Sequence, residues 1–431
     1  MKVLMITLAL LSSGPWSLKD CIDYALDHNI TVQKSANTVK DKEIALNTAQ
    51  GRRLPNLSAS ASENFSFGRG IGEDNTYSNA NTSTTGFSLS SSVPVFQGFD
   101  INNDIKLSRL NLAAATSDLA KAKDDIRVEV AKAYVQILYD KEILQVAENQ
   151  AVTDSVLYDR LVSMRDVGKA SVSDVVAQQA TLAKSRLSVT QATNNLSLAL
   201  LDLTQLLELS SPEGFDIVCP AEESLGIRLL MNPEEIYAAA VDSKPSIKSE
   251  ELRLDYAKVS IDRAKGAYMP SLSLSGGIGS NYYTSSITTP LSFGEQIKNN
   301  FSQYLGLSLS IPIFSRFSTR NQVKSAEISY ANQQLTLESA RKNLYKEIQQ
   351  AYYNAVAAQS KYLSSAEAEK SARASYELTK EKYENGKADI AEYNESENRY
   401  LEAASNYLQA RYECLYQSSL LDFYRDGTLE F

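Results

Sequence analysis

A long stretch without glycine or proline occurs twice in this chain, and it constrains the fold more than any other feature. Neither residue type occurs in 101–167 or in 313–385. Because both residues interrupt helices, each stretch can form one helix on the order of 100 Å long, at about 1.5 Å per residue. Apolar and small residues recur in it at every seventh position, which indicates coiled-coil packing. They are Ile105, Leu112, Leu119, Ile126 and Ala133, then Val323, Tyr330, Leu337, Leu344 and Ala351.

The chain is duplicated at a fixed offset. Pro94 in the segment LSSSVPVF and Pro312 in LSLSIPIF are 218 residues apart, and the same offset relates Gly168 to Gly386. A fixed internal period of this size indicates a repeated structural unit. The expected division is a signal peptide at 1–14, a first repeat at 15–209, a linker or equatorial segment at 210–231, and a second repeat at 232–431.

The first residues have the layout of a secretory signal peptide. Lys2 precedes the apolar run 3–11, which small residues follow, and this run is too short to span a bilayer as a helix. We therefore expect export. The alternative is an apolar N-terminal strand or helix of the mature protein.

Composition argues against catalysis and against nucleic-acid binding. His28 is the only histidine and lies in no ligand pattern, so we interpret it as a surface or cap residue. The formal net charge is −9, and no basic patch is visible. Cys21, Cys219 and Cys414 are too far apart for a disulfide framework or a zinc motif, and we interpret them as packing residues. We expect no enzyme activity, no cofactor and no metal.

Each half begins with a helical pattern, over 17–53 and over 232–268, and Ser17 is placed to cap the first. Each pattern ends at a proline, after which serine alternates with apolar residues as in a strand with one hydroxylated face. Polar segments at 68–83 and 276–300 then precede a second strand of the same kind. The serines of this face are Ser58, Ser60, Ser88, Ser90, Ser273, Ser275, Ser308 and Ser310.

A second helix pattern follows each long one. The breaks are at Gly168-Lys169 and Gly386-Lys387, where glycine supplies the left-handed conformation that ends a helix. The chain then doubles back until about residues 209 and 423. Each half is thus expected to pack a long helix beside two shorter ones stacked end to end, with the strands at one end and the Gly-Lys turn at the other.

Four strands of about 10 to 14 residues are long enough to cross a membrane, but about eight strands are needed to close a barrel. Open edges in lipid leave backbone groups unsatisfied, so the chain is expected to share a barrel with copies of itself. The serine face would then line the lumen. Aromatic residues near the strands suit an interfacial girdle, whereas the alternative is a soluble sandwich edge. They are Phe65, Phe67, Tyr282, Tyr283, Phe293, Phe301 and Tyr304.

Short motifs stand in a fixed order along the chain, and several of them are present twice. They are the opening segment 17–29, the strand entries Leu54-Pro55 and Met269-Pro270, the exits Val-Pro-Val-Phe and Ile-Pro-Ile-Phe, the pairs Ala133-Tyr134 and Ala351-Tyr352, and the turns at Gly168 and Gly386. In these motifs the sequence resembles TolC-like outer-membrane efflux proteins over essentially the whole mature chain. The resemblance implies a mainly α fold with membrane β-structure: a duplicated coiled-coil α-barrel and, from three chains, a twelve-stranded β-barrel.

The resemblance also implies a function and partners. It predicts a homotrimeric duct in the outer membrane of a Gram-negative bacterium, with a large periplasmic portion and with outer-membrane lipid around the barrel. Such a duct conducts substrates passively to the exterior, as part of a tripartite efflux or type I secretion system. Its partners would be a periplasmic adaptor (membrane fusion) protein and an inner-membrane transporter.

Two sites follow from the resemblance. The first is the adaptor-facing tip at Gly168, Lys169, Gly386 and Lys387, for which an ordinary helix cap is the alternative.

The second is a gate at the periplasmic entrance. Glu392 and Glu395 stand three apart on one helix face and match acidic positions of the family that ring this entrance. The first half offers only Asp174 and Ala177 there, and Tyr383 matches a position that helps to hold the entrance shut. The alternative is a solvated acidic face near a helix N-terminus.

Two other classes remain open. An exported or soluble coiled-coil scaffold would account for the long helices, but not for the signal-like N-terminus or the amphipathic strands. An enzyme is the weaker alternative, because most carboxylates lie on helix faces among lysine and arginine.

Overall fold

The computed structural model of this protein describes residues 14–71, 75–220 and 230–429. Nearly all of the predicted signal peptide lies outside this part, as do residues 221–229 of the predicted linker. The described residues form two compact units, each built from separated segments of the chain. Among these described residues, the first unit takes those within 14–37, 117–220, 230–248 and 338–429, and the second takes those within 38–71, 75–116 and 249–337.

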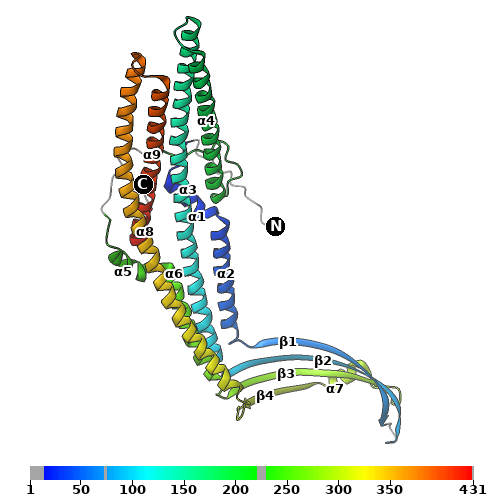
Figure 1. The fold of residues 1–431 in the computed structure, drawn as a ribbon. Helices are drawn as coiled ribbons and strands as arrows, with labels where there is room; N and C mark the ends of the chain where they lie inside the picture. Colours follow the sequence, from blue (N-terminus) through cyan, green and yellow to red (C-terminus); the bar gives the residue numbers. More distant parts are fainter. Residues whose placement is uncertain (1–13, 72–74, 221–229, 430–431) are drawn as a thin grey trace. The chain divides into compact units, whose positions relative to one another are not determined.

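The two halves of the chain have the same order of elements, with one short helix inserted in the second half (Figure 1). The first half contains α1 (Leu18–His28), α2 (Ile30–Gly51), β1 (Asn56–Ile71), β2 (Tyr77–Gln97), α3 (Asp100–Asp166) and α4 (Val172–Leu206). The second half contains α5 (Pro233–Ser243), α6 (Pro245–Gly266), β3 (Ser271–Ser285), the inserted α7 (Phe293–Asn299), β4 (Ser302–Ser310), α8 (Ser318–Glu384) and α9 (Ile390–Asp426).

The two long helices confirm the prediction of uninterrupted helices. Both α3 and α8 contain 67 residues, about 100 Å each at the usual helical rise. All ten side chains at the predicted heptad positions are buried or half-buried. The seven-residue pattern therefore marks the packed face of each helix. In the part of the chain that the structure describes, no helix combines the length and the apolar character needed to cross a bilayer.

The predicted single helix over 17–53 is wrong, because the chain breaks there into α1 and α2. Asn29 has an extended backbone (φ −61°, ψ 129°), and its side-chain amide donates to the carbonyl oxygen of Leu206 at 3.0 Å. This contact with a distant segment replaces a continuous helix. The predicted cap is confirmed, since the Ser17 hydroxyl accepts a hydrogen bond from the backbone N–H of Asp20 at 3.2 Å.

The predicted helix over 232–268 is interrupted in the same way, between α5 and α6. Lys244 has ψ 127°, outside the helical region. The reason is local, because the next residue is Pro245 and a residue that precedes proline is pushed away from the helical conformation.

The strands form one antiparallel sheet in the order β1-β2-β3-β4. With 16, 21, 15 and 9 residues, three of them are longer than predicted. The predicted polar loop at 68–83 is largely strand, since β1 continues to Ile71 and β2 begins at Tyr77. The predicted loop at 276–300 is strand only as far as Ser285, where β3 ends, and its later part contains α7. Serine, threonine and tyrosine in these segments satisfy their backbone groups in the ladder with the neighbouring strand.

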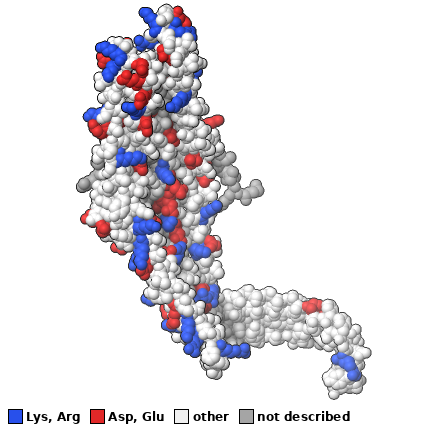
Figure 2. Space-filling view, viewed as in Figure 1, with Lys and Arg blue, Asp and Glu red and all other residues white. Residues whose placement is uncertain are grey.

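The sheet carries almost no charge. Glu63 and Arg69 are the only charged residues in the four strands. Figure 2 shows the resulting surface, on which the strand region is nearly free of Lys, Arg, Asp and Glu in this view, while both signs cover the helices. A strand surface without charge is suited to lipid.

The main apolar core of the first unit lies where α1, α3, α4 and the end of α9 meet. Ile137 and Leu138 of α3 and Leu203 of α4 have no exposed surface. The hydroxyl of Tyr134 donates to the carbonyl oxygen of Val218 at 2.6 Å and so ties the segment after α4 to this core.

The predictions for the histidine and for two of the three cysteines are confirmed, and the prediction for the third cysteine is wrong. His28 is a surface residue, as predicted, in the last turn of α1, with its ring stacked on that of Tyr24 at 3.9 Å between centroids. Cys21 and Cys414 are buried packing residues. Cys219 is exposed, which corrects its prediction as a packing residue.

Candidate functional site

The two Gly-Lys turns are built alike. Gly168, between α3 and α4, has φ +75°, and Gly386, between α8 and α9, has φ +70°. This left-handed conformation favours glycine. The backbone N–H groups of Lys169 and Lys387 donate to the carbonyl oxygens five residues earlier, at 2.7 and 2.8 Å, which closes each helix in a Schellman motif. A Cβ added at either glycine would have nothing within 4 Å, so both turns are open to solvent.

The helix after each turn begins at a capped residue. The Ser171 hydroxyl accepts from the backbone N–H of Asp174 at 3.0 Å, and the Asp389 carboxylate accepts from that of Glu392 at 2.8 Å. Asp174 is the first-half counterpart of Glu392, but its carboxylate is used in the cap, where it accepts from the Ser171 N–H at 3.1 Å. The Glu392 side chain is exposed and has no partner among the described residues.

Glu395 lies one turn further along the same face of α9. Its side chain is 65% exposed and forms an ion pair with Arg399, four residues on. The two glutamates therefore differ, because one carboxylate is unpaired and the other is partly neutralised by its own helix.

Tyr383 is not placed with these glutamates. Its ring lies 5.2 Å from that of Tyr393 between centroids, in a cluster that joins the α3–α4 hairpin to the α8–α9 hairpin. Burial raises the pKa of its hydroxyl. The cluster consists of Leu157, Leu161, Val175 and Tyr393, with Tyr158, Val162, Ala170, Tyr376, Tyr383 and Ile390 packed against them.

A buried polar group lies beside this cluster, and sequence reasoning missed it. The hydroxyls of Tyr376 and Tyr393 are 3.0 Å apart, and they donate to Oε1 of Glu397 at 3.3 and 3.2 Å. Glu397 is only 3% exposed, and burial raises the pKa of its carboxyl group. A cavity of about 290 Å³ between α3, α4 and α9 brings Glu397 and Asp154 together. The sequence shows that Tyr393 and Glu397 are four residues apart and so share a helix face. It does not show that Asp154 lies near Glu397.

The eight predicted lumen serines lie on one face of the sheet. Ser58 stands opposite Ser90 and Ser60 opposite Ser88, and directly opposed residues share a face. The two pairs of hydroxyl oxygens lie 3.1 and 2.7 Å apart. Ser273 stands opposite Ser308, and Ser275 stands opposite a β2 residue of this same face.

Strict alternation of apolar and serine residues along β2 predicts Val95 on the apolar face, and this prediction is wrong. A β-bulge between Pro94 and Phe96 shifts the register, so that Phe96, and not Val95, stands opposite Leu272. A bulge places two residues opposite one and reverses the alternation beyond it.

The aromatic residues do not form a single outward belt. Phe65 and Phe67 lie on the apolar face. Tyr304 stands opposite Gly277, and Gly277 stands opposite a serine of the serine face, so Tyr304 lies on the serine face. Tyr283, opposite Thr84, lies there too. The predicted girdle is therefore divided between the two faces.

A duplicated array of long helices with a nearly uncharged sheet matches a known family. The model of the family described as "Outer membrane efflux protein" matches residues 21–208 and again residues 236–423. The chain belongs to the outer membrane efflux protein family. This is a family of channels and not of enzymes, and the resemblance to TolC-like proteins is thereby confirmed.

Individual relatives agree with the family assignment. The chain is 25% identical to the outer membrane protein TolC of Escherichia coli over 399 residues, which cover 90% of this chain and 77% of TolC. It is 26% identical to the protein CyaE of Bordetella pertussis over 335 residues, which cover 75% of this chain and 66% of CyaE.

Solved structures share the fold at lower identity. CusC superposes with a TM-score of 0.80 at 18% identity, covering 95% of this chain and 92% of CusC. The open outer membrane channel MtrE of Neisseria gonorrhoeae gives 0.75 at 18% identity, covering 95% and 88%. This efflux-family protein thus combines α-barrel and β-barrel architecture. It is an outer-membrane duct for efflux or secretion in a Gram-negative bacterium, with a large periplasmic portion.

Proposed function

We propose that three copies of this chain close one twelve-stranded barrel and form the outer duct of a tripartite efflux or type I secretion system. The observation that carries this proposal is the open sheet, in which β1 and β4 pair on one side only within the described residues. About eight strands are needed for a closed barrel, and an unpaired edge in lipid is costly. In this arrangement 15–209 and 232–431 are the two structural repeats of each protomer.

The serine face lines the lumen of the proposed barrel and the leucine-rich face contacts lipid. Hydroxyl groups present a hydrated wall with little charge selectivity, as a passive duct requires. The exposed leucines of β4, Leu305, Leu307 and Leu309, are 80%, 67% and 61% accessible and support a lipid-facing role.

The exposed Gly-Lys turns are the proposed contact with a periplasmic adaptor protein, which an inner-membrane transporter serves. Glu392 and Glu395 of three protomers form the proposed gate ring, and Tyr383 steadies it by packing the two hairpins together. Carboxylates gathered around one axis repel each other and attract cations.

Particle mass tests the assembly. The purified, detergent-solubilised protein is expected at three times the mass of one chain, which is 47.5 kDa for these 431 residues, after correction for bound detergent. Cross-linking in outer-membrane preparations should stop at trimers. A particle that stays monomeric or dimeric in both experiments would refute the proposal, and a protein that leaves the membrane without detergent would point to the coiled-coil scaffold.

A further inference from the structure

The second compact unit contains a basic cavity of about 520 Å³ where its strands meet its helices. Arg53, Lys106, Arg109 and Lys265 line this cavity, and Asp262 is the one carboxylate in its lining. All five side chains are exposed. Four cations against one anion give the cavity an excess of positive charge that a ligand can reach.

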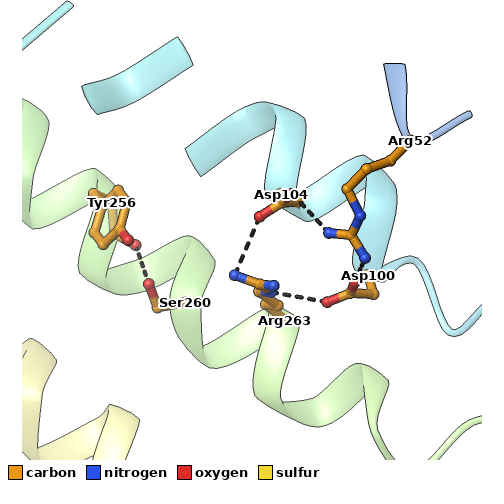
Figure 3. A network of polar contacts seen from close by, with 6 residues as sticks. All are labelled: Arg52, Asp100, Asp104, Tyr256, Ser260 and Arg263. Carbon is orange, nitrogen blue, oxygen red and sulfur yellow. Dashed lines mark hydrogen bonds and ion pairs between the residues drawn. The ribbon is translucent and has the colours of Figure 1, made fainter. Parts of the chain in front are cut away.

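Two further carboxylates on α3, those of Asp100 and Asp104, are already paired. Arg52 donates to Asp100 at 2.8 Å and to Asp104 at 2.7 Å, and Arg263 contacts the other oxygens of the same two aspartates at 2.8 and 3.2 Å (Figure 3). Two arginines and two aspartates balance each other in this network. The aspartates are therefore not available to neutralise the lining of the cavity.

The basic groups of the lining lack anionic partners. Lys106, Arg109 and Lys265 form no ion pair within the described residues, and Arg53 donates only to the amide oxygen of Asn102, at 2.7 Å. Asn103 also lines the cavity and is only 8% exposed, yet its side-chain amide has no hydrogen bond within the described residues. An amide donor without a hydrogen bond, placed among cations, is a donor set suited to phosphate oxygens.

The cavity lies at the boundary of the membrane part. Arg53 precedes β1 by three residues, and Met269 precedes β3 by two. Two chain segments of its lining approach each other closely, since a Cβ at Gly98 would lie 2.2 Å from the carbonyl oxygen of Gly266. Apolar side chains lie exposed at the same boundary, with Leu54 68% and Phe99 51% accessible. Because the strands lie in the outer membrane and the helices in the periplasm, the cavity faces the level of the inner-leaflet headgroups.

We propose that this cavity binds the phosphate group of an anionic phospholipid from the periplasmic leaflet of the outer membrane. The guanidinium and ammonium groups hold the phosphate, the Asn103 amide donates to one of its oxygens, and the acyl chains lie along the exposed apolar side chains. Basic residues near a membrane surface attract anionic lipid in this way. The proposal goes beyond conduction through the duct and does not depend on the gate or on the adaptor contact.

Native mass spectrometry of the detergent-solubilised full-length assembly tests the site. Phosphatidylglycerol, phosphatidylcholine and inorganic phosphate are titrated separately. The double variant Lys106→Gln/Arg109→Gln is compared with Arg320→Gln/Lys324→Gln. The control removes the same two charges from exposed positions at the start of α8, where Lys324 is the second-half counterpart of Lys106. We expect the cavity variant to bind phosphatidylglycerol about tenfold more weakly or worse, and the control to bind it as the unaltered protein does.

Each titration and each variant has an outcome that supports or contradicts the proposal. Tight binding of phosphatidylglycerol over phosphatidylcholine, lost only in the cavity variant, supports the proposal. Equal losses in both variants would show general surface attraction and overturn it, and so would the absence of phosphatidylglycerol binding by the unaltered protein. Occupancy by inorganic phosphate that excludes the lipid would assign the cavity to a free anion instead. Lys265→Gln on α6 repeats the test from a second helix if the α3 variant does not assemble.

Discussion

The side-chain amide of Gln178 donates a hydrogen bond to Oδ1 of Asp154 at 3.2 Å, between residues that are 0% and 1% exposed. The bond joins α4 to α3. Oδ2 of Asp154 and Oε1 of Gln178 have no partner within the described residues, which is costly for buried polar atoms. Together with Glu397, the pair concentrates two buried carboxylates where the hairpins meet, and such a site is sensitive to a change in charge.

Replacing Glu397 by Gln should change how stability depends on pH. Burial raises the pKa of Glu397 above its ordinary value of 4.5, so the folded state favours the neutral form. The raised pKa contributes stability to the folded state. This contribution is fully present below the ordinary pKa and is lost as the pH rises through the raised pKa of the folded state. The unaltered protein should therefore lose thermal stability with rising pH over this window, and Glu397→Gln should lose less.

Thermal unfolding followed by circular dichroism across this pH range measures the effect. Glu402→Gln is the matched control, because Glu402 is an exposed carboxylate on the same helix. Parallel profiles for Glu397→Gln and the unaltered protein would contradict the prediction.

Substitutions on the two faces of β4 should differ in effect. Leu307 stands opposite Leu274 on the apolar face, whereas Ser308 stands opposite Ser273 on the serine face. Leu307→Arg should destabilise the assembled protein by about 2 kcal/mol or more if the residue is near the bilayer centre, and Ser308→Arg should be tolerated. Urea unfolding in lipid vesicles measures the stability of both variants. Equal destabilisation at the two positions would contradict the assignment of the two faces.

The proposed gate ring should respond to charge changes in both directions. Glu392→Gln/Glu395→Gln should weaken the block of single-channel current by multivalent cations added from the periplasmic side. Arg399→Gln should strengthen it, because it frees Glu395 from its ion pair. Glu402→Gln again serves as the control. If block is the same in all these proteins, the glutamates are only a solvated helix face.

Substitutions in the Gly-Lys turns should impair docking without impairing folding. Asparagine tolerates the left-handed conformation that Gly168 and Gly386 adopt, whereas valine is strained there by roughly 1–2 kcal/mol per site. Gly168→Asn/Gly386→Asn should therefore leave the trimer intact and still reduce export, because it adds side chains to a contact surface. Export and trimer yield are measured together. Normal export by the asparagine variant would mean that the turns serve only as helix caps.

The local parts of this fold could be predicted from the chain. The offset between Gly168 and Gly386 and the absence of glycine and proline over 101–167 and 313–385 predict two long helices of equal length, ending in similar turns. The break before Pro245 was also readable, since proline constrains its predecessor. In each case the cause lies within a few residues of its effect.

The sequence by itself determined the repeat, the long helices, the turns and the two-sided character of the strands, because these depend on short-range sterics and on hydrophobic period. Tertiary structure alone decided the break at Asn29, the bulge beside Pro94, the meeting of Asp154 with Glu397 and the basic cavity around Asn103. These features join residues that are far apart in the chain. Packing of whole helices and strands sets their distances, and no local pattern encodes which side chains then meet.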